Sequence, residues 1–241
     1  MGKPADVSDA DSRDHDVLII GGGVIGLCCG WSLARAGRTV TILDRHPTRR
    51  ESCSDENAGM VVPSHFIPLA APGVIAQGLK WMLNPKSPFY LRPRLDPALW
   101  SWCWQFFRHA NVRHVEDTKQ LLADFSLESR RLFLEWAEEL QFDLTTRGLM
   151  MLCRTEAGLE SEAKVAAQAA NVGVEAEVCD AARVRELDPD IAMDVTGGVW
   201  FAQDSHLDPQ IFMEELRRGI RERGGTFLDA DCKKIIRNKN R

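Results

Sequence analysis

The pattern of apolar and polar positions near the amino terminus predicts a strand, a helix and a second strand in succession. The continuous apolar run at 16–20 is typical of a strand buried on both faces of a parallel sheet. Residues 24–37 then carry small residues on one side of a helical repeat, and Gly37 marks the carboxyl-terminal end of that helix. A second apolar run at 38–44 ends at Asp44. This order predicts an α/β fold at the start of the chain.

The middle of the chain has a different pattern, in which helices are followed by strands that do not alternate with helices. Residues 99–107 predict a short helix on which Trp100, Trp104 and Phe107 share one face. Residues 117–140 predict an amphipathic helix, whose apolar stripe consists of Leu122, Phe125, Leu132, Trp136 and Leu140. This succession predicts an α+β insertion distinct from the first strands.

The last part of the chain predicts short elements with clear boundaries. Asp208 and Pro209 are typical of an N-cap and a first helical residue, so we expect a helix from there to about Arg223. Asp188 and Asp190 flank Pro189 and indicate turn and cap residues. The other expected elements are strands at 149–153, 194–202 and 224–230 and a helix at 156–173.

Between the first strand and the first helix stands a G-x-G-x-x-G motif at Gly21, Gly23 and Gly26. The first glycine permits a tight turn, the second lets backbone approach a pyrophosphate, and the third lets helix and strand pack closely. Gly30 adds another small position on the helix. Asp44, about 20 residues on, is placed to hydrogen-bond a ribose 2′-hydroxyl, and an acid there argues against NADP. The motif predicts an adenine dinucleotide, either NAD or FAD.

The segment after the second strand separates these two cofactors. Residues 45–66 form an irregular polar stretch with "NAG" at Asn57–Gly59, where an NAD domain would alternate strand and helix. With "AAPG" and "KWM" in 69–83 and "GGVWFAQDSHLDPQIF" at 197–212, the chain resembles the FAD-dependent D-amino acid oxidase and glycine oxidase superfamily. The match is nearest to the D-amino acid dehydrogenase branch.

The resemblance implies a fold and a set of cofactor contacts. The fold is a Rossmann-like parallel sheet of the glutathione-reductase type, incomplete in this chain, with an α+β substrate-domain insertion. We expect a return strand near the carboxyl end, followed by a residue that contacts adenine. The residues expected at FAD are Gly21, Gly23, Val24, Ile25, Gly26, Asp44, Arg45, Ser54, Asn57, Ala58, Gly59, Met60 and Cys232.

The implied reaction is oxidation of a D-amino acid by hydride transfer from its Cα to flavin N5, giving a 2-oxo acid and ammonia. Glycine, sarcosine or hydroxyproline are alternative substrates, and a short non-catalytic nucleotide-binding module is a third reading. The sequence nominates no acid–base pair. His65 falls near the flavin by resemblance, where it would contact substrate, tune the ring or have no chemical role.

The composition of the chain argues against several classes of binding partner. The net charge of −5 gives no general attraction to nucleic acid or anionic membrane. No apolar run reaches the roughly 18 residues that span a bilayer. The seven cysteines lack C-x-x-C spacing, so we expect small buried side chains, no metal site and a cytoplasmic protein.

The aromatic residues at 100–107 favour packing between helices. The alternative is peripheral contact with the inner membrane, where electrons would pass to quinone or the respiratory chain.

The expected domain organisation has four parts. Residues 1–13 are a disordered tail, 14–66 the first part of the FAD domain, 67–196 the substrate domain, and 197–241 a truncated return to the FAD domain. No second glycine-rich flavin loop follows Gly26, and the substrate-binding arginine and tyrosine of the family are not visible. We therefore expect an amino-terminal fragment that holds FAD poorly and has little activity.

Overall fold

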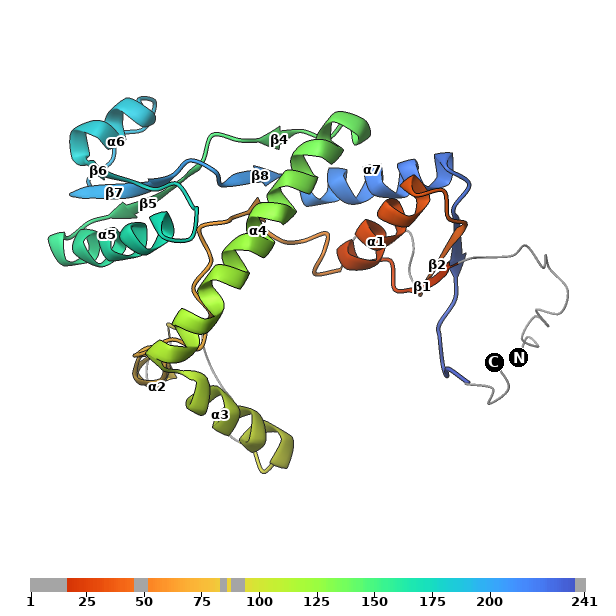
Figure 1. Cartoon of the computed structure of the whole chain (residues 1–241), viewed down its shortest axis with the longest axis horizontal. Helices are drawn as coiled ribbons and strands as arrows, with labels where there is room; N and C mark the ends of the chain where they lie inside the picture. Colours follow the sequence, from red (N-terminus) through yellow and green to blue (C-terminus); the bar gives the residue numbers. More distant parts are fainter. Residues whose placement is uncertain (1–16, 46–51, 83–85, 88–93, 237–241) are drawn as a thin grey trace, which may run out of the picture. The chain divides into compact units, whose positions relative to one another are not determined.

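The computed structural model describes residues 17–45, 52–82, 86–87 and 94–236, and the expected tail lies outside them (Figure 1). The chain divides into two compact units. Unit 1 comprises 1–59, 135–144 and 207–241, and unit 2 comprises 60–134 and 145–206. The domain boundaries expected from the sequence remain a prediction.

Unit 1 is built on a parallel three-stranded sheet in the order β1-β2-β9. Val17 of β1 is in register with Val40 of β2, and Ile42 of β2 with Phe227 of β9. The expected return strand therefore pairs with the strand that ends at Asp44. The elements of unit 1 are β1 (Val17–Ile20), α1 (Val24–Arg35), β2 (Val40–Asp44), α7 (Pro209–Glu222) and β9 (Thr226–Asp229).

The helices α1 and α7 pack together through glycines that leave room for large side chains. A Cβ on Gly30 would lie 2.9 Å from Cδ1 of Ile42, and one on Gly219 would lie 2.7 Å from the ring of Trp31. Trp31 is fully buried, and the guanidinium of Arg223 lies 4.3 Å from its ring centroid. The predicted close packing at Gly30 is confirmed. The core of unit 1 thus lies between α1, α7 and one face of the sheet.

The opposite face of this sheet is apolar but open, contrary to expectation. Leu18 and Ile20 of β1 are 56% and 50% exposed, and Leu228 of β9 is 47% exposed. The prediction that the first strand is buried on both faces is wrong for this chain. The cause is that, among the described residues, α1 and α7 pack on the face that carries Ile19 and Ile42.

Unit 2 contains an antiparallel sheet in the order β5-β7-β6, with α5 and α6 on its two faces (Figure 1). Its core gathers Phe66, Ala123, Ala166, Ala169, Val172, Val174, Val199 and Phe201. A short antiparallel pair joins Met60 of β3 to His206 of β8. The elements that lie wholly or mostly in unit 2 are β3 (Met60–Val61), α2 (Val74–Met82), α3 (Pro97–His109), α4 (Val112–Leu140), β4 (Leu144–Thr145), β5 (Leu149–Cys153), α5 (Glu156–Ala170), β6 (Glu177–Asp180), α6 (Ala181–Leu187), β7 (Gly197–Phe201) and β8 (Ser205–Leu207). Residues 135–140 of α4, Leu144 of β4 and Leu207 of β8 belong to unit 1.

Capping explains where several helices begin. The carboxylate of Asp208 accepts hydrogen bonds from the N–H groups of Gln210 and Ile211 at the start of α7, as predicted. Asp96 caps α3 in the same way. The helix predicted at 117–140 instead begins at Val112, because Asn111 accepts from the His114 amide and starts the helix earlier.

Two predictions about apolar side chains in unit 2 are wrong. Phe125, placed in the buried stripe of α4, is 75% exposed. The aromatic residues of α3 do not pack between helices: Trp100, Trp104 and Phe107 are about 60% exposed, at 61%, 60% and 59%. An amphipathic pattern marks which face is apolar, but it does not say whether the rest of the chain covers that face.

Candidate cofactor-binding site

The G-x-G-x-x-G turn has the conformation that its glycines predict. Gly21 has φ +105°, in the region that favours glycine, and its N–H donates to the carbonyl oxygen of Leu43 at 2.8 Å. A Cβ on Gly26 would overlap the carbonyl oxygen of Gly21. Gly23 is the N-cap of α1 and has no side chain to cap the helix. Helix and strand therefore meet closely at this turn.

Two side chains from other parts of unit 1 fix the turn. The carboxylate of Asp44 accepts a hydrogen bond from the Gly22 N–H at 2.6 Å. The hydroxyl of Ser54 accepts from the Val24 N–H at 3.1 Å and thus replaces the missing cap of α1. We call residues 21–26, with Asp44 and Ser54, the phosphate cradle. Seven predicted site residues therefore lie together, namely Gly21, Gly23, Val24, Ile25, Gly26, Asp44 and Ser54.

The stretch that contains "NAG" forms a tight loop held by Asn57. Its amide nitrogen donates to the carbonyl oxygen of Ser54 at 2.7 Å, and its amide oxygen accepts from the Gly59 N–H at 2.7 Å. Gly59 has φ +62°, and a Cβ there would overlap the carbonyl oxygen of Leu207. Gly59 is one of the residues expected at FAD, and in this structure the absence of its side chain makes room for the backbone of Leu207.

No sequence pattern points to Asp55, which lies inside this loop. Asp55 is 3% exposed, and its Oδ2 accepts a hydrogen bond from the hydroxyl of Ser52 at 2.6 Å. Its Oδ1 has no hydrogen-bond partner among the described residues. Alternation of polar residues cannot reveal that one of them turns inward.

Four other predicted contacts lie outside the phosphate cradle. Arg45 follows Asp44 directly and is exposed, as is Ala58 of the loop. Met60 begins β3 in unit 2 and is paired with His206. Cys232 lies three residues beyond β9 and is exposed, while the Ala230 N–H donates to the carbonyl oxygen of Asp44. The roles of these four residues remain predictions.

The cradle fits the phosphate and ribose groups of a dinucleotide. Among the described residues, the N–H groups of Ile25 and Gly26 have no hydrogen-bond acceptor, and the first turn of α1 contains no acidic residue. Such amides, with the helix dipole, attract an anion. The carboxylate of Asp44, held beside the turn by its bond to the Gly22 N–H, is the kind of group that accepts hydrogen bonds from ribose hydroxyls. The residues present therefore suit FAD.

A second polar cluster lies in unit 2 and joins residues far apart in sequence. Asp204 is fully buried, and its carboxylate accepts from the Ser64 N–H at 3.1 Å and from the Ser64 hydroxyl at 2.6 Å. The Ser64 oxygen is 3.0 Å from Nδ1 of the exposed His65. Burial raises the pKa of Asp204, opposed by the Ser64 hydrogen bonds and by the charges of His65 and Arg130.

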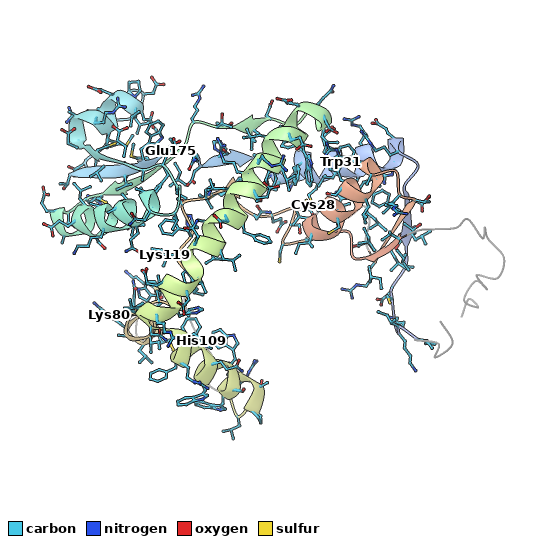
Figure 2. The ribbon with its side chains drawn as sticks, in the orientation of Figure 1. Cys28, Trp31, Lys80, His109, Lys119 and Glu175 are labelled. Carbon is cyan, nitrogen blue, oxygen red and sulfur yellow. The ribbon has the colours of Figure 1, made fainter. Side chains whose placement is uncertain are left out.

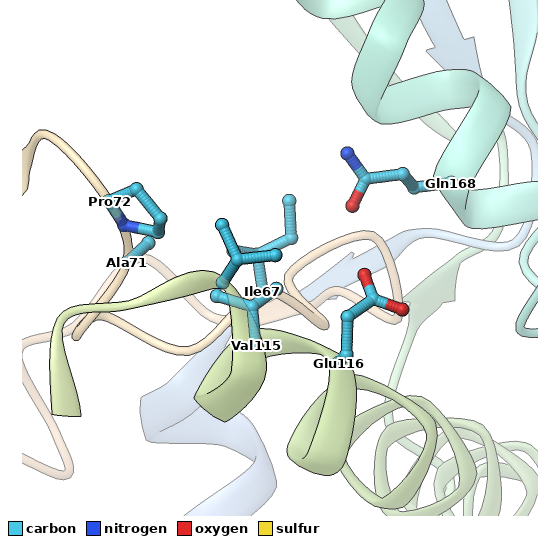
Figure 3. Close-up of a pocket in the computed structure, with 7 residues that line it drawn as sticks. Ile67, Ala71, Pro72, Val115, Glu116 and Gln168 are labelled. Carbon is cyan, nitrogen blue, oxygen red and sulfur yellow. The ribbon is translucent and has the colours of Figure 1, made fainter.

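Two cavities also open on unit 2. One, of about 240 Å³, is lined by Ile67, Ala71 and Pro72 of a loop, by Val112, Val115 and Glu116 of α4, and by Gln168 of α5 (Figure 3). The other, of about 400 Å³, lies beside Arg147, Asp188 and Trp200. Neither of these two cavities is lined by a predicted site residue.

The cysteine side chains differ in burial more than predicted. Cys153 and Cys179 are buried, but Cys29, Cys53 and Cys232 are exposed, so the expectation of seven buried thiols is wrong. On α1, one turn before Trp31, burial raises the pKa of Cys28 to about 12, and the neighbouring Cys29 adds to the shift (Figure 2). Such a thiol stays protonated and unreactive near neutral pH. No group of metal-ligating side chains is found among the described residues.

Comparison with solved structures supports the same fold. The chain is similar to glycine oxidase from Geobacillus kaustophilus, with TM-score 0.61 and 20% identity over 89% of this chain and 46% of that one. It is also similar to L-proline dehydrogenase from P. horikoshii (0.55, 17%, 88% and 43%) and to L-amino acid deaminase from Proteus vulgaris (0.56, 12%, 94% and 42%). The chain thus spans less than half the length of each of these proteins.

The family comparison covers almost the whole chain. Residues 16–241 match the family described as DAO, FAD dependent oxidoreductase. The predicted α/β fold with a parallel sheet is confirmed, and so, at the level of the family, is FAD as the cofactor. The chain belongs to the DAO family of FAD-dependent oxidoreductases.

Proposed function

We propose that this chain supplies the dinucleotide-binding part of an enzyme that oxidises D-amino acids. The observation that carries the proposal is the phosphate cradle, in which the Ile25 and Gly26 N–H groups lack acceptors among the described residues and Asp44 is held in place. When bound, FAD supplies the oxidising power by accepting a hydride from the substrate Cα at N5. The imine product then reacts with water to give a 2-oxo acid and ammonia.

The chain's own residues would bind and orient the cofactor. The helix amides would hold the phosphates, Asp44 and Arg45 would bind the adenosine ribose, and the loop fixed by Asn57 would contact the cofactor. Cys232 would contact adenine through its backbone. These assignments rest on the resemblance and on the hydrogen bonds that already shape the cradle and the loop.

By resemblance His65 falls near the flavin, and on that ground we propose that it accepts the proton that an amino acid ammonium must lose before oxidation. When Asp204 is ionised, the Ser64 hydroxyl donates its hydrogen bond to that carboxylate. The Ser64 oxygen can then accept a hydrogen bond from Nδ1–H of His65. The chain Asp204–Ser64–His65 thus leaves Nε2 of the imidazole as a proton acceptor. A positioned base of this kind contributes roughly 10²–10⁴-fold to a rate.

We further propose that the enzyme is a dehydrogenase, which passes its electrons to a quinone or another respiratory carrier. It would then be a cytoplasmic protein with peripheral contact to the inner membrane. No helix among the described residues is long and apolar enough to cross a membrane.

The test reconstitutes the chain with excess FAD and follows the visible flavin absorbance without oxygen. We expect weak but saturable FAD binding, and slow bleaching that is fastest with D-amino acids. Faster bleaching by glycine, sarcosine or hydroxyproline would move the proposal to the alternative substrates. A chain that binds adenine nucleotides but shows no bleaching with any substrate would favour the non-catalytic module. Reoxidation by a soluble quinone analogue faster than by oxygen would support the dehydrogenase.

A further inference from the structure

Residues 66–115, which we call the aromatic-basic segment, contain two helices without a core. Neither α2 nor α3 has a single buried residue. The segment nevertheless holds four of the chain's seven tryptophans, namely Trp81, Trp100, Trp102 and Trp104. Figure 1 shows both helices near the amino-terminal end of α4, within unit 2.

The apolar side chains of α3 form one broad, ordered face. At about 100° per residue, they sweep an arc of roughly 200°, from Trp102 through Phe106, Leu99, Cys103, Phe107 and Trp100 to Trp104. Rings stack along this face, Trp102 on Phe106 at 5.2 Å and Trp104 on Phe107 at 5.9 Å between centroids. The opposite side carries Ser101, Gln105 and Arg108. Such a face is wider than the narrow seam by which one helix packs on another.

The charge of the segment is opposite to that of the chain. It contains Lys80, Lys86, Arg92, Arg94, Arg108 and Arg113 against a single acid, Asp96, and so carries +5 in a chain of net charge −5. The remaining residues therefore carry −10. Asp96 is itself occupied, since it caps α3 and pairs with Arg94 at 3.3 Å. Lys80 and His109 mark the two helices in Figure 2.

We propose that the aromatic-basic segment docks on the surface of an anionic lipid bilayer. Tryptophan rings prefer the headgroup level of a membrane, and lysine and arginine are attracted to anionic lipid by about 1 kcal/mol each. The acidic remainder of the chain is repelled from the same surface, so the charge asymmetry orients the protein. The inference gives the proposed membrane contact a defined surface, and its test needs neither FAD nor turnover.

The experiment is co-sedimentation of the full 241-residue chain with vesicles of phosphatidylcholine, alone or with about 30% phosphatidylglycerol. We expect the bound fraction at about 0.1 M salt to be at least about tenfold higher with the anionic vesicles, and to fall at about 1 M salt. Combined Trp100→Ala, Trp104→Ala and Phe107→Ala should reduce binding about tenfold or more. These residues are exposed, so far-ultraviolet circular dichroism should be unchanged.

Matched controls lie elsewhere in unit 2. Leu121→Ala with Phe125→Ala removes equally exposed apolar side chains from α4 and should leave binding unchanged. Lys80→Glu with Arg108→Glu should weaken binding, whereas Arg154→Glu, outside the segment, should not. The proposal is overturned if the chain stays in solution with anionic vesicles, or if the aromatic triple variant binds as well as the parent. A different result would also overturn it: the parent is a dimer, the triple variant is a monomer, and neither protein binds lipid. In that case a second copy of the chain covers the aromatic face.

Discussion

Trp31 on α1 and Trp104 on α3 are the same residue on two helices, yet one is sealed in a core and the other is 60% exposed. Around Trp31, Gly30 and Gly219 keep the space that a neighbouring helix and strand fill. Around Trp104, the aromatic face meets no covering element among the described residues. The difference teaches that helical periodicity identifies an apolar face, whereas small residues on a facing element indicate that the face is packed within the chain.

Replacing each tryptophan is the strongest way to break this comparison. Trp31→Ala should lower the free energy of unfolding by about 3–5 kcal/mol, because it empties the core between α1 and α7. Trp104→Ala should change it by less than about 0.5 kcal/mol. Urea denaturation followed by circular dichroism measures both. Equal losses would show that α3 is packed in solution and that the contrast is wrong.

A side chain at Gly26, which packs against the backbone of Gly21, should disrupt the phosphate cradle. Gly26→Ala places a methyl group on the carbonyl oxygen of Gly21, so the turn must open. We expect a loss of FAD affinity of about tenfold or more, or about 1.4 kcal/mol, measured by quenching of flavin fluorescence. Gly158→Ala in α5 is the control and should leave FAD affinity unchanged. Unaltered affinity in the Gly26→Ala protein would remove the cradle from the FAD site.

The buried carboxylate of unit 2 predicts a pH dependence. Because the native pKa of Asp204 is raised from 3.8, the native state keeps this proton longer than the unfolded state. Its contribution to stability is therefore largest at low pH and declines as pH rises from the ordinary value through the raised one. The free energy of unfolding of the parent minus that of Asp204→Asn, measured at a series of pH values, should show that decline.

The same variant tests the proposed proton acceptor. The introduced amide donates where the carboxylate accepted, so the Ser64 hydroxyl is released to donate to Nδ1 of His65. Nitrogen NMR should then show the imidazole proton moving from Nδ1 to Nε2. An unchanged tautomer would mean that Asp204 does not act on His65 through Ser64.

The smallest effect is expected at the amino-terminal cap that Ser54 provides for α1. Ser54→Ala removes the acceptor of the Val24 N–H and should cost about 1 kcal/mol of stability. Ser32→Ala, which removes a hydroxyl from within the same helix, should cost less than about 0.5 kcal/mol. Equal costs would show that Ser54 does not cap the helix.

The sequence predicts local features of this protein well. The strand, the glycine turn and the helix follow from a few neighbouring residues, and Gly21 and Gly26 adopt the geometry that their spacing requires. The N-cap at Asp208 is equally local. The return of the last strand to the first sheet was implied by the resemblance to a family. Its pairing with the second strand was not predicted, because no pattern in either strand selects its neighbour.

The features that sequence reasoning missed depend on residues far apart in the chain. Ser54 was expected at the cofactor, but nothing local shows that it caps a helix 30 residues earlier. Ser64 and Asp204 are 140 residues apart, and no periodicity connects them. Burial of Asp55 and exposure of the α3 aromatics likewise depend on which elements cover them, which patterning does not determine.

The pairing of β2 with β9 also sets the order in which the chain can fold. Thr41 meets Thr226 across this pair at 2.9 Å, and the core around Trp31 needs α7. During synthesis, residues 17–59 therefore lack α7 and β9 until residues 209–229 have been made. Unit 2 is complete before unit 1 and can fold first. Closing so long a loop is slow, and α1 meanwhile exposes its apolar side to chaperones and to other nascent chains.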